Sequence, residues 1–249
     1  MRLLALLVLT SCAARTTLAQ VHPAPATRPS QGASTDSSGA GLFLNARPEA
    51  YLLVDQLRRG GLVIFMRHAK TDMDGTDLLP PDYRSCAAQR NLSPSGRAAT
   101  REVSASWRYL GIRISSAAAS PFCRAIETAT QLMPRAATND SLAVVPPGVG
   151  AGDRLQAMLR TRRPGPGSNA LLVGHVMSAW QAFGVRLQEG EALILEPMPG
   201  GAPPRVIGRV GAIEWGDVHR DTRTHGVPMV TRAATAQTAA IRPTAPPPK

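Results

Sequence analysis

The spacing of apolar residues predicts alternating helices and short buried strands over the central part of the chain. Apolar side chains recur at helical spacing from Glu49 to Arg58, and Gly60-Gly61 ends this helix. Residues 62–66 are all apolar and predict a buried strand. Further strands are predicted at 112–118, 142–145, 170–173, 192–195 and 205–213. Further helices are predicted at 94–110, 121–133 and 153–162, with a short one ending at 183.

This order of elements predicts the fold class. Strands that alternate with helices predict an α/β three-layer sandwich with a mostly parallel central sheet and helices on both faces. The last two strands follow each other without a helix, so we expect them to be antiparallel at the sheet edge. Ser93 is predicted to cap a helix that has Pro94 at its first position. Ligands in such folds bind beyond the carboxyl ends of the strands.

The two ends of the chain differ from this core. Residues 1–19 begin Met-Arg and continue with an apolar run, as export signal peptides do. Small residues before Gln20 predict cleavage there, whereas Leu-Thr-Ser-Cys ending at Cys12 resembles a bacterial lipobox, and both alternatives stay open. Residues 20–45 and 219–249 are rich in Pro, Ala and Thr and predict a disordered linker and tail. We therefore expect a folded domain over 46–218 in a periplasmic or secreted protein, held at a membrane only if Cys12 is lipidated.

Composition and charge exclude several classes of protein. The 249 residues include 28 Lys+Arg and 17 Asp+Glu, a net charge of +11. Basic residues form no run longer than two, and aromatic residues make up only 4%, which argues against a nucleic-acid partner. Beyond the N-terminus, no stretch approaches the roughly 20 apolar residues that span a bilayer. A hydrophobic content of 43% is ordinary for a globular domain.

Nitrogen-bearing side chains follow three of the predicted strands. Arg67 and His68 follow the first strand, Arg124 enters the helix after the second, and His175 follows the strand at 170–173. Guanidinium groups match phosphate oxygens, and a neutral imidazole is a nucleophile near pH 7 because its ordinary pKa is about 6.5. A single residue of this kind is more often structural, but their convergence at one sheet edge predicts a phosphoryl-transfer site.

These residues lie in motifs that resemble those of the histidine phosphatase superfamily, which has a phosphoglycerate mutase-like fold. The motifs are Val-Ile-Phe-Met-Arg-His-Ala at 63–69, Asn-Leu-Ser-Pro-Ser-Gly-Arg at 91–97, Ser-Pro-Phe-Cys-Arg-Ala-Ile-Glu-Thr-Ala at 120–129 and Leu-Val-Gly-His at 172–175. The resemblance implies that His68 attacks phosphorus and becomes phosphohistidine, while Arg67, Arg124 and His175 hold the phosphoryl oxygens. It implies no metal and no other cofactor. Ala69 stands where the family usually has glycine.

The resemblance leaves the general acid unassigned. Many members of the family place a Glu after the third strand, and Asp140 is the only carboxylate in that part of this sequence. Others place an Asp directly after the second His, where this chain has Val176. The loop that follows His68 adds four further candidates: Asp72, Asp74, Asp77 and Asp82.

Together these observations predict an exported phosphatase for a small phosphorylated substrate, with a sugar or lipid phosphate expected. The export signal and the long loop resemble the periplasmic lipopolysaccharide core heptose-phosphate phosphatases. One alternative is a phosphatase of phosphohistidine in proteins, because a phosphoramidate needs less help from an acid. The other alternative is a non-catalytic anion-binding module on the same fold.

Two cysteines remain after the signal region. Cys86 lies in the long loop and Cys123 beside Arg124. An even pair in an oxidising compartment predicts a disulfide that pins the loop, with two free thiols as the alternative. His68 and Asp72 are four residues apart, but they follow a strand, so no helix aligns them as metal ligands.

Overall fold

The computed structural model describes residues 48–78, 80–144 and 150–226. The predicted export signal with Cys12, the linker and most of the predicted tail lie outside the described residues. Within the part of the chain that is described, no helix is long and apolar enough to cross a membrane.

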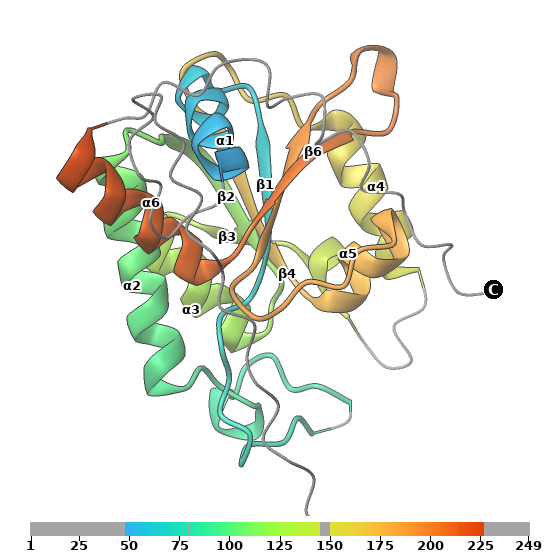
Figure 1. The fold of residues 1–249 in the computed structure, drawn as a ribbon. Helices are drawn as coiled ribbons and strands as arrows, with labels where there is room; N and C mark the ends of the chain where they lie inside the picture. The colour runs from blue at the N-terminus through green and yellow to red at the C-terminus, as the bar shows by residue number, and fades with distance from the viewer. Residues whose placement is uncertain (1–47, 79, 145–149, 227–249) are drawn as a thin grey trace, which may run out of the picture. The chain divides into compact units, whose positions relative to one another are not determined.

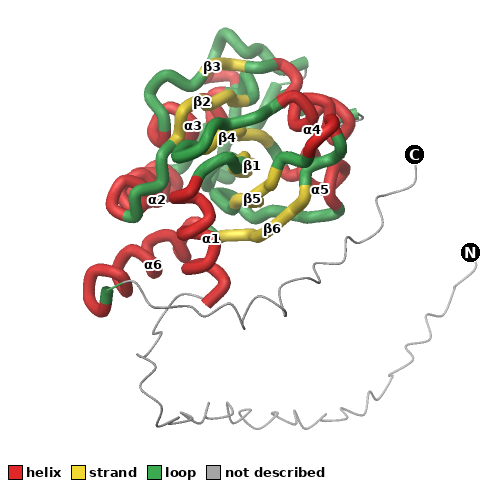
Figure 2. The backbone as a smooth tube through the Cα atoms, turned by 90° about the horizontal axis from the view of Figure 1, so that it is seen from above, coloured by secondary structure: helices red, strands yellow, loops and turns green. Residues whose placement is uncertain are grey.

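A six-stranded sheet forms the centre of the domain, in the order β3-β2-β4-β1-β5-β6 (Figure 2). The strands are β1 (Val63–Arg67), β2 (Ile114–Ala119), β3 (Ala137–Thr138), β4 (Asn169–Gly174), β5 (Ala192–Glu196) and β6 (Arg205–Val210). The pairs from β3 to β1 are parallel, whereas β5 and β6 are antiparallel. The predicted antiparallel pair at the sheet edge is confirmed.

Helices cover both faces of the sheet (Figure 1). They are α1 (Pro48–Arg59), α2 (Pro94–Tyr109), α3 (Cys123–Leu132), α4 (Ala151–Thr161), α5 (Val176–Phe183) and α6 (Ala212–His225). Alternate residues of β1 point to opposite faces, so Ile64 packs in one core with α1, α2, α3 and α6, and Phe65 packs in the other with α4 and α5. The predicted three-layer α/β sandwich is confirmed.

The strand register brings the predicted site residues to one edge of the sheet. Arg67, at the end of β1, lies opposite Gly174 at the end of β4, and Ala119, at the end of β2, lies opposite Val173. Backbone hydrogen bonds continue one residue beyond the strands, with the His68 N–H donating to the Gly174 carbonyl at 3.0 Å. The residues that follow β1, β2 and β4 are therefore neighbours.

The strand predicted at 142–145 is wrong over the residues described there. Residues Asp140–Leu142 form a 3-10 turn, and the third strand is the short β3, which precedes them. The Asn139 side chain caps this turn by accepting a hydrogen bond from the Ser141 N–H at 2.9 Å. Leu142 is fully buried in the same core cluster as Ala170 and Leu172 of β4, so its apolar side chain reflects burial rather than membership of a strand. Val145 lies outside the described residues.

The C-terminal part of the domain also differs from the prediction. The last strand ends at Val210 rather than 213, and α6 continues through residues 219–225, which were predicted as part of the tail. Buried Trp215 anchors this helix to the core, and the Tyr51 hydroxyl donates to the buried carboxylate of Asp221 at 2.6 Å. These contacts order a segment whose composition alone resembles a linker. Similarly, α3 begins at Cys123 rather than Pro121.

Candidate active site

A pocket of about 300 Å³ lies beyond the carboxyl ends of β1 and β4. It is lined by Arg67, His68, Asp77, Arg90, Phe122, Arg124, Val144, His175, Val176 and Met177. The structure therefore brings together all four residues predicted to bind and transfer a phosphoryl group. Asp77 and Arg90 reach the same pocket from the loop between β1 and α2.

His68 is held as a neutral imidazole with one nitrogen available. Its Nδ1 lies 2.9 Å from the Ala69 carbonyl oxygen, which can only accept, so we assign the proton to Nδ1 and a lone pair to Nε2. The side chain is buried, and burial together with Arg124 and Arg67 lowers the pKa of His68 to about 3. At neutral pH, His68 therefore presents a nucleophilic nitrogen.

His175 is the second histidine that lines the pocket. It is buried at the start of α5, and its Nε2 lies 2.8 Å from the Ser120 hydroxyl. Its ring centroid is 5.3 Å from that of His68, and Phe122 packs edge-on against it at 5.0 Å. Burial, followed by the effect of His68, lowers the pKa of His175 well below its usual value. The two imidazoles are thus neutral neighbours.

Arg67 and Arg124 are fixed by their outer nitrogens. Arg67 donates from Nη1 to the Leu187 carbonyl at 2.9 Å, and its Nη2 lies 3.4 Å from Glu189. Arg124 donates from Nη1 to Asp77 at 2.8 Å. The Nε atom of each arginine is buried and has no hydrogen-bond partner. Each guanidinium is therefore held through its Nη atoms, while its Nε–H has no hydrogen-bond partner.

Arg90 is a third guanidinium in the pocket, and it was not among the predicted site residues. Its Nε atom is likewise buried without a partner, and its backbone carbonyl accepts from Arg124 Nη1 at 3.2 Å. Arg90 directly precedes the motif at 91–97, which was the available signal. A position next to a motif does not reveal where the side chain points, however. The conformation of the loop between β1 and α2 is what brings Arg90 to the pocket.

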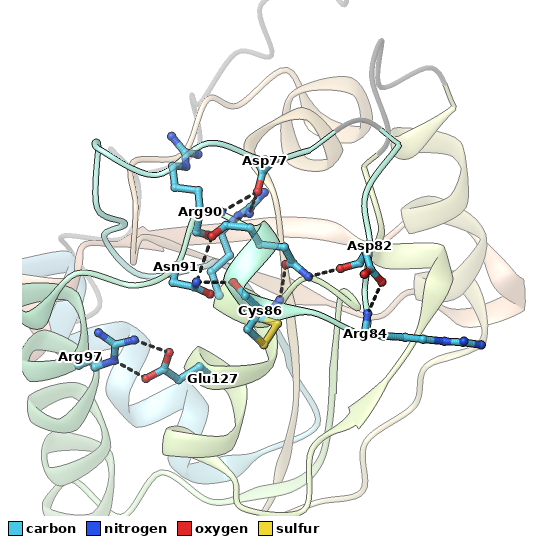
Figure 3. Close-up of a disulfide and its surroundings, with 11 residues drawn as sticks. Asp77, Asp82, Arg84, Cys86, Arg90, Asn91, Arg97 and Glu127 are labelled. Carbon is cyan, nitrogen blue, oxygen red and sulfur yellow. Dashed lines mark hydrogen bonds and ion pairs between the residues drawn. A yellow bond between two sulfur atoms is a disulfide. The ribbon is translucent and has the colours of Figure 1, made fainter.

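The predicted disulfide is present and excludes the alternative of two free thiols. Cys86 and Cys123 are bonded, with their Cα atoms 5.7 Å apart (Figure 3). Beside the bond, the Gln89 side chain accepts from the Cys123 N–H at 2.9 Å and donates to the Asp82 carbonyl at 2.9 Å. The disulfide thus joins the loop that carries Asp77 and Arg90 to the first residue of the helix that carries Arg124.

Of the five candidate acids, only one lines the pocket. Asp140 is exposed and is not among the described residues that line the pocket. The side chains of Asp72, Asp74 and Asp82 are also exposed, and only Asp77 among these candidates lines the pocket. Across the described residues, no three His, Cys, Asp or Glu side chains are grouped so that they could hold a metal ion.

Comparisons with known proteins give matches at the level of structure. No protein-family model matches the chain, and no curated protein matches it. The protein histidine phosphatase SixA complexed with tungstate matches with a TM-score of 0.45 and 16% identity, over 61% of this chain and 97% of that one. A phosphoserine phosphatase mutant from Entamoeba histolytica, in complex with phosphoserine, matches with a TM-score of 0.43 and 12% identity, over 61% and 98%. Scores and identities this low establish no function for this chain.

Proposed function

We propose that the protein is a phosphatase that hydrolyses a phosphate monoester through a phosphohistidine at His68. One observation supports this most strongly: Arg67, Arg90 and Arg124 line one pocket, and the Nε atom of each is buried without a hydrogen-bond partner. A buried donor without a partner costs about 1–3 kcal/mol, so three of them favour a site that is completed by an anion. A neutral imidazole among these cations adds a nucleophile to the anion site.

The reaction follows from this arrangement. The three guanidiniums hold the phosphoryl oxygens, and the Nε2 lone pair of His68 attacks phosphorus. The new P–N bond forms as the bond to the leaving oxygen breaks, and that oxygen takes the electron pair. The arginines stabilise the charge on the equatorial oxygens, and the Ala69 carbonyl stabilises the imidazolium through Nδ1. Water then attacks phosphorus, the P–N bond breaks, and inorganic phosphate leaves.

The substrate class and location are further parts of the proposal. The four motifs and their resemblance to the histidine phosphatases favour a metal-independent reaction. The apolar side chains at the pocket, Phe122, Val144, Val176 and Met177, offer contacts for the non-phosphate part of a small substrate. The predicted export signal favours a periplasmic or secreted enzyme, and we propose a sugar or lipid phosphate as its substrate. The heptose phosphates of lipopolysaccharide are the first substrates to test.

Phosphate release from p-nitrophenyl phosphate with EDTA present tests the proposal, with His68→Ala alongside. We expect activity that survives EDTA and is lost in the variant. Tight phosphate binding without turnover, in protein shown to be folded, would instead favour the anion-binding module. Turnover of a phosphoramidate but of no phosphate ester would favour a phosphohistidine phosphatase.

A further inference from the structure

Asp77 lies inside the pocket as the partner of a phosphate-binding arginine. Its Oδ1 accepts from Arg124 Nη1 at 2.8 Å and from the Arg90 backbone N–H at 3.0 Å. Both hydrogen bonds of this side chain within the described residues end on Oδ1. The second carboxylate oxygen, Oδ2, is therefore left for a proton or a substrate.

The reaction needs a proton at this place. When the bond from phosphorus to the leaving oxygen breaks, an alkoxide or aryloxide would form unless a proton reaches that oxygen. Asp77 is the only carboxyl group among the described residues that line the pocket. Residues 145–149, which follow Val144 in the sequence and are not described, read Val-Pro-Pro-Gly-Val and contain no acid.

We propose, building on the phosphatase function above, that Asp77 is the proton donor for the leaving group. Protonated Asp77 gives its proton to the leaving oxygen while His68 attacks phosphorus, which yields the alcohol, phosphohistidine and the Asp77 carboxylate. In the second step, the carboxylate takes a proton from the attacking water as the P–N bond breaks. Asp77 is then protonated again and the proton balance closes.

The charges around Asp77 make its protonation depend on the substrate. Burial acts to raise the pKa of Asp77, but the Arg90 N–H and the ion pair with Arg124 outweigh it and hold the pKa below its usual value in the free protein. A bound phosphoryl group places negative charge beside the carboxylate and competes for Arg124, so the proton is favoured when substrate is present. The titratable and charged groups that share the pocket with Asp77 are Arg67, His68, Arg90, Arg124 and His175.

Asp140, another candidate acid from the sequence analysis, lacks this placement. It is exposed on the 3-10 turn after β3. The pKa of Tyr83 is raised, first by burial of its hydroxyl and then by the negative charge of Asp140. Asp74 is an exposed carboxylate on the same loop as Asp77. These two residues provide matched comparisons for a test of Asp77.

The test compares leaving groups of different basicity in the full protein. p-Nitrophenolate leaves without a proton, whereas phenolate and glycerol need one. We expect Asp77→Asn to lower kcat about 10²-fold or more for phenyl phosphate and glycerol phosphate, with a much smaller loss for p-nitrophenyl phosphate. We expect Asp74→Asn and Asp140→Asn to leave this ratio unchanged. In the wild-type protein, kcat for phenyl phosphate should fall with rising pH, and this fall should be absent in Asp77→Asn.

Two results with the variants would overturn the inference while leaving the phosphatase function intact, and so would a third result with the wild-type protein. One is an equal loss for all three substrates in Asp77→Asn, which would mean that Asp77 only positions Arg124. The other is a selective loss in Asp140→Asn. Should Asp77→Asn not fold, wild-type pH profiles that are identical for phenyl and p-nitrophenyl phosphate would overturn it as well. A wild-type protein that hydrolyses none of the esters would overturn the proposed function and this inference with it.

Discussion

The hydroxyl of Thr128 accepts a hydrogen bond from the backbone N–H of Ala69 at 3.1 Å, and it donates to the Arg124 carbonyl at 2.7 Å. Thr128 is fully buried on α3, one turn after Arg124. This one side chain therefore joins α3, which carries Arg124, to the residue that follows His68, the proposed nucleophile.

We expect Thr128→Val to disturb both stability and the site. The substitution keeps the shape of the side chain but leaves the buried Ala69 N–H without a partner, which costs about 1–3 kcal/mol of the free energy of unfolding. Urea denaturation measures this loss, and phosphate release measures the accompanying fall in kcat. Thr130→Val is the control, because the Thr130 hydroxyl only bonds the Glu127 carbonyl within its own helix. Equal stability of both variants would contradict the linking role of Thr128.

The disulfide is expected to stabilise the domain and order the loop. Cys86 and Cys123 are 37 residues apart, and closing a loop of that length stabilises the folded state by about 4 kcal/mol in the chain-entropy model. The double variant Cys86→Ser, Cys123→Ser should lose stability of this order in chemical denaturation. It should also bind phosphate more weakly, because Arg90 is no longer pinned beside α3. Unchanged phosphate affinity would show that the loop is held without the disulfide.

Arg90 is expected to contribute directly to anion binding. Arg90→Ala removes a charge-assisted donor from the pocket, worth about 1.5–3 kcal/mol, or roughly tenfold to a hundredfold in the dissociation constant for inorganic phosphate. Isothermal titration calorimetry measures this change. Arg84→Ala is the matched control, since Arg84 lies on the same loop with an exposed side chain (Figure 3). An equal change in the phosphate dissociation constant for both variants would mean that Arg90 acts only through its positive charge, and not by contact with the anion.

Stability is expected to fall on acidification through the two buried histidines. In the folded protein the pKa of His68 is about 3, against 6.5 when exposed, so the unfolded chain binds more protons between these values. The stabilising contribution of neutral His68 is therefore present above pH 6.5 and is lost as the pH falls toward 3. His175 acts in the same direction. Unfolding free energies measured across this range should decline less steeply for His68→Asn than for the wild type.

The sequence predicted those parts of the site that local pattern determines. Apolar runs placed β1 and β4, and Ser93 caps α2 as expected, accepting from the Gly96 N–H at 3.0 Å. Arg67 ends β1, and His68 and His175 directly follow β1 and β4, so the strand register brings these three together. Arg124 is carried by α3, which follows β2, the neighbour of β4 in the sheet. The disulfide could be anticipated because only two cysteines, Cys86 and Cys123, follow the predicted signal region.

Other parts depend on contacts between distant segments. Asp77 lies in a loop without periodicity, and its place in the pocket comes from Arg90 and from Arg124, which is 47 positions away. The extension of α6 depends on Asp221 meeting Tyr51, which is 170 positions away. The apolar stretch at 142–145 matched a strand pattern, yet Asn139 and the burial of Leu142 produce a 3-10 turn. Such partners are not visible in local sequence.

The central claim is that His68 becomes phosphorylated during turnover. The most direct measurement is acid-free rapid quench of the protein with a ³²P-labelled phosphate ester, followed by peptide mapping of the label. We predict label on the peptide that contains His68, stable in alkali and labile in acid, and absent from His68→Ala. Full hydrolysis of the ester by His68→Ala, or label on any other residue, would contradict the account.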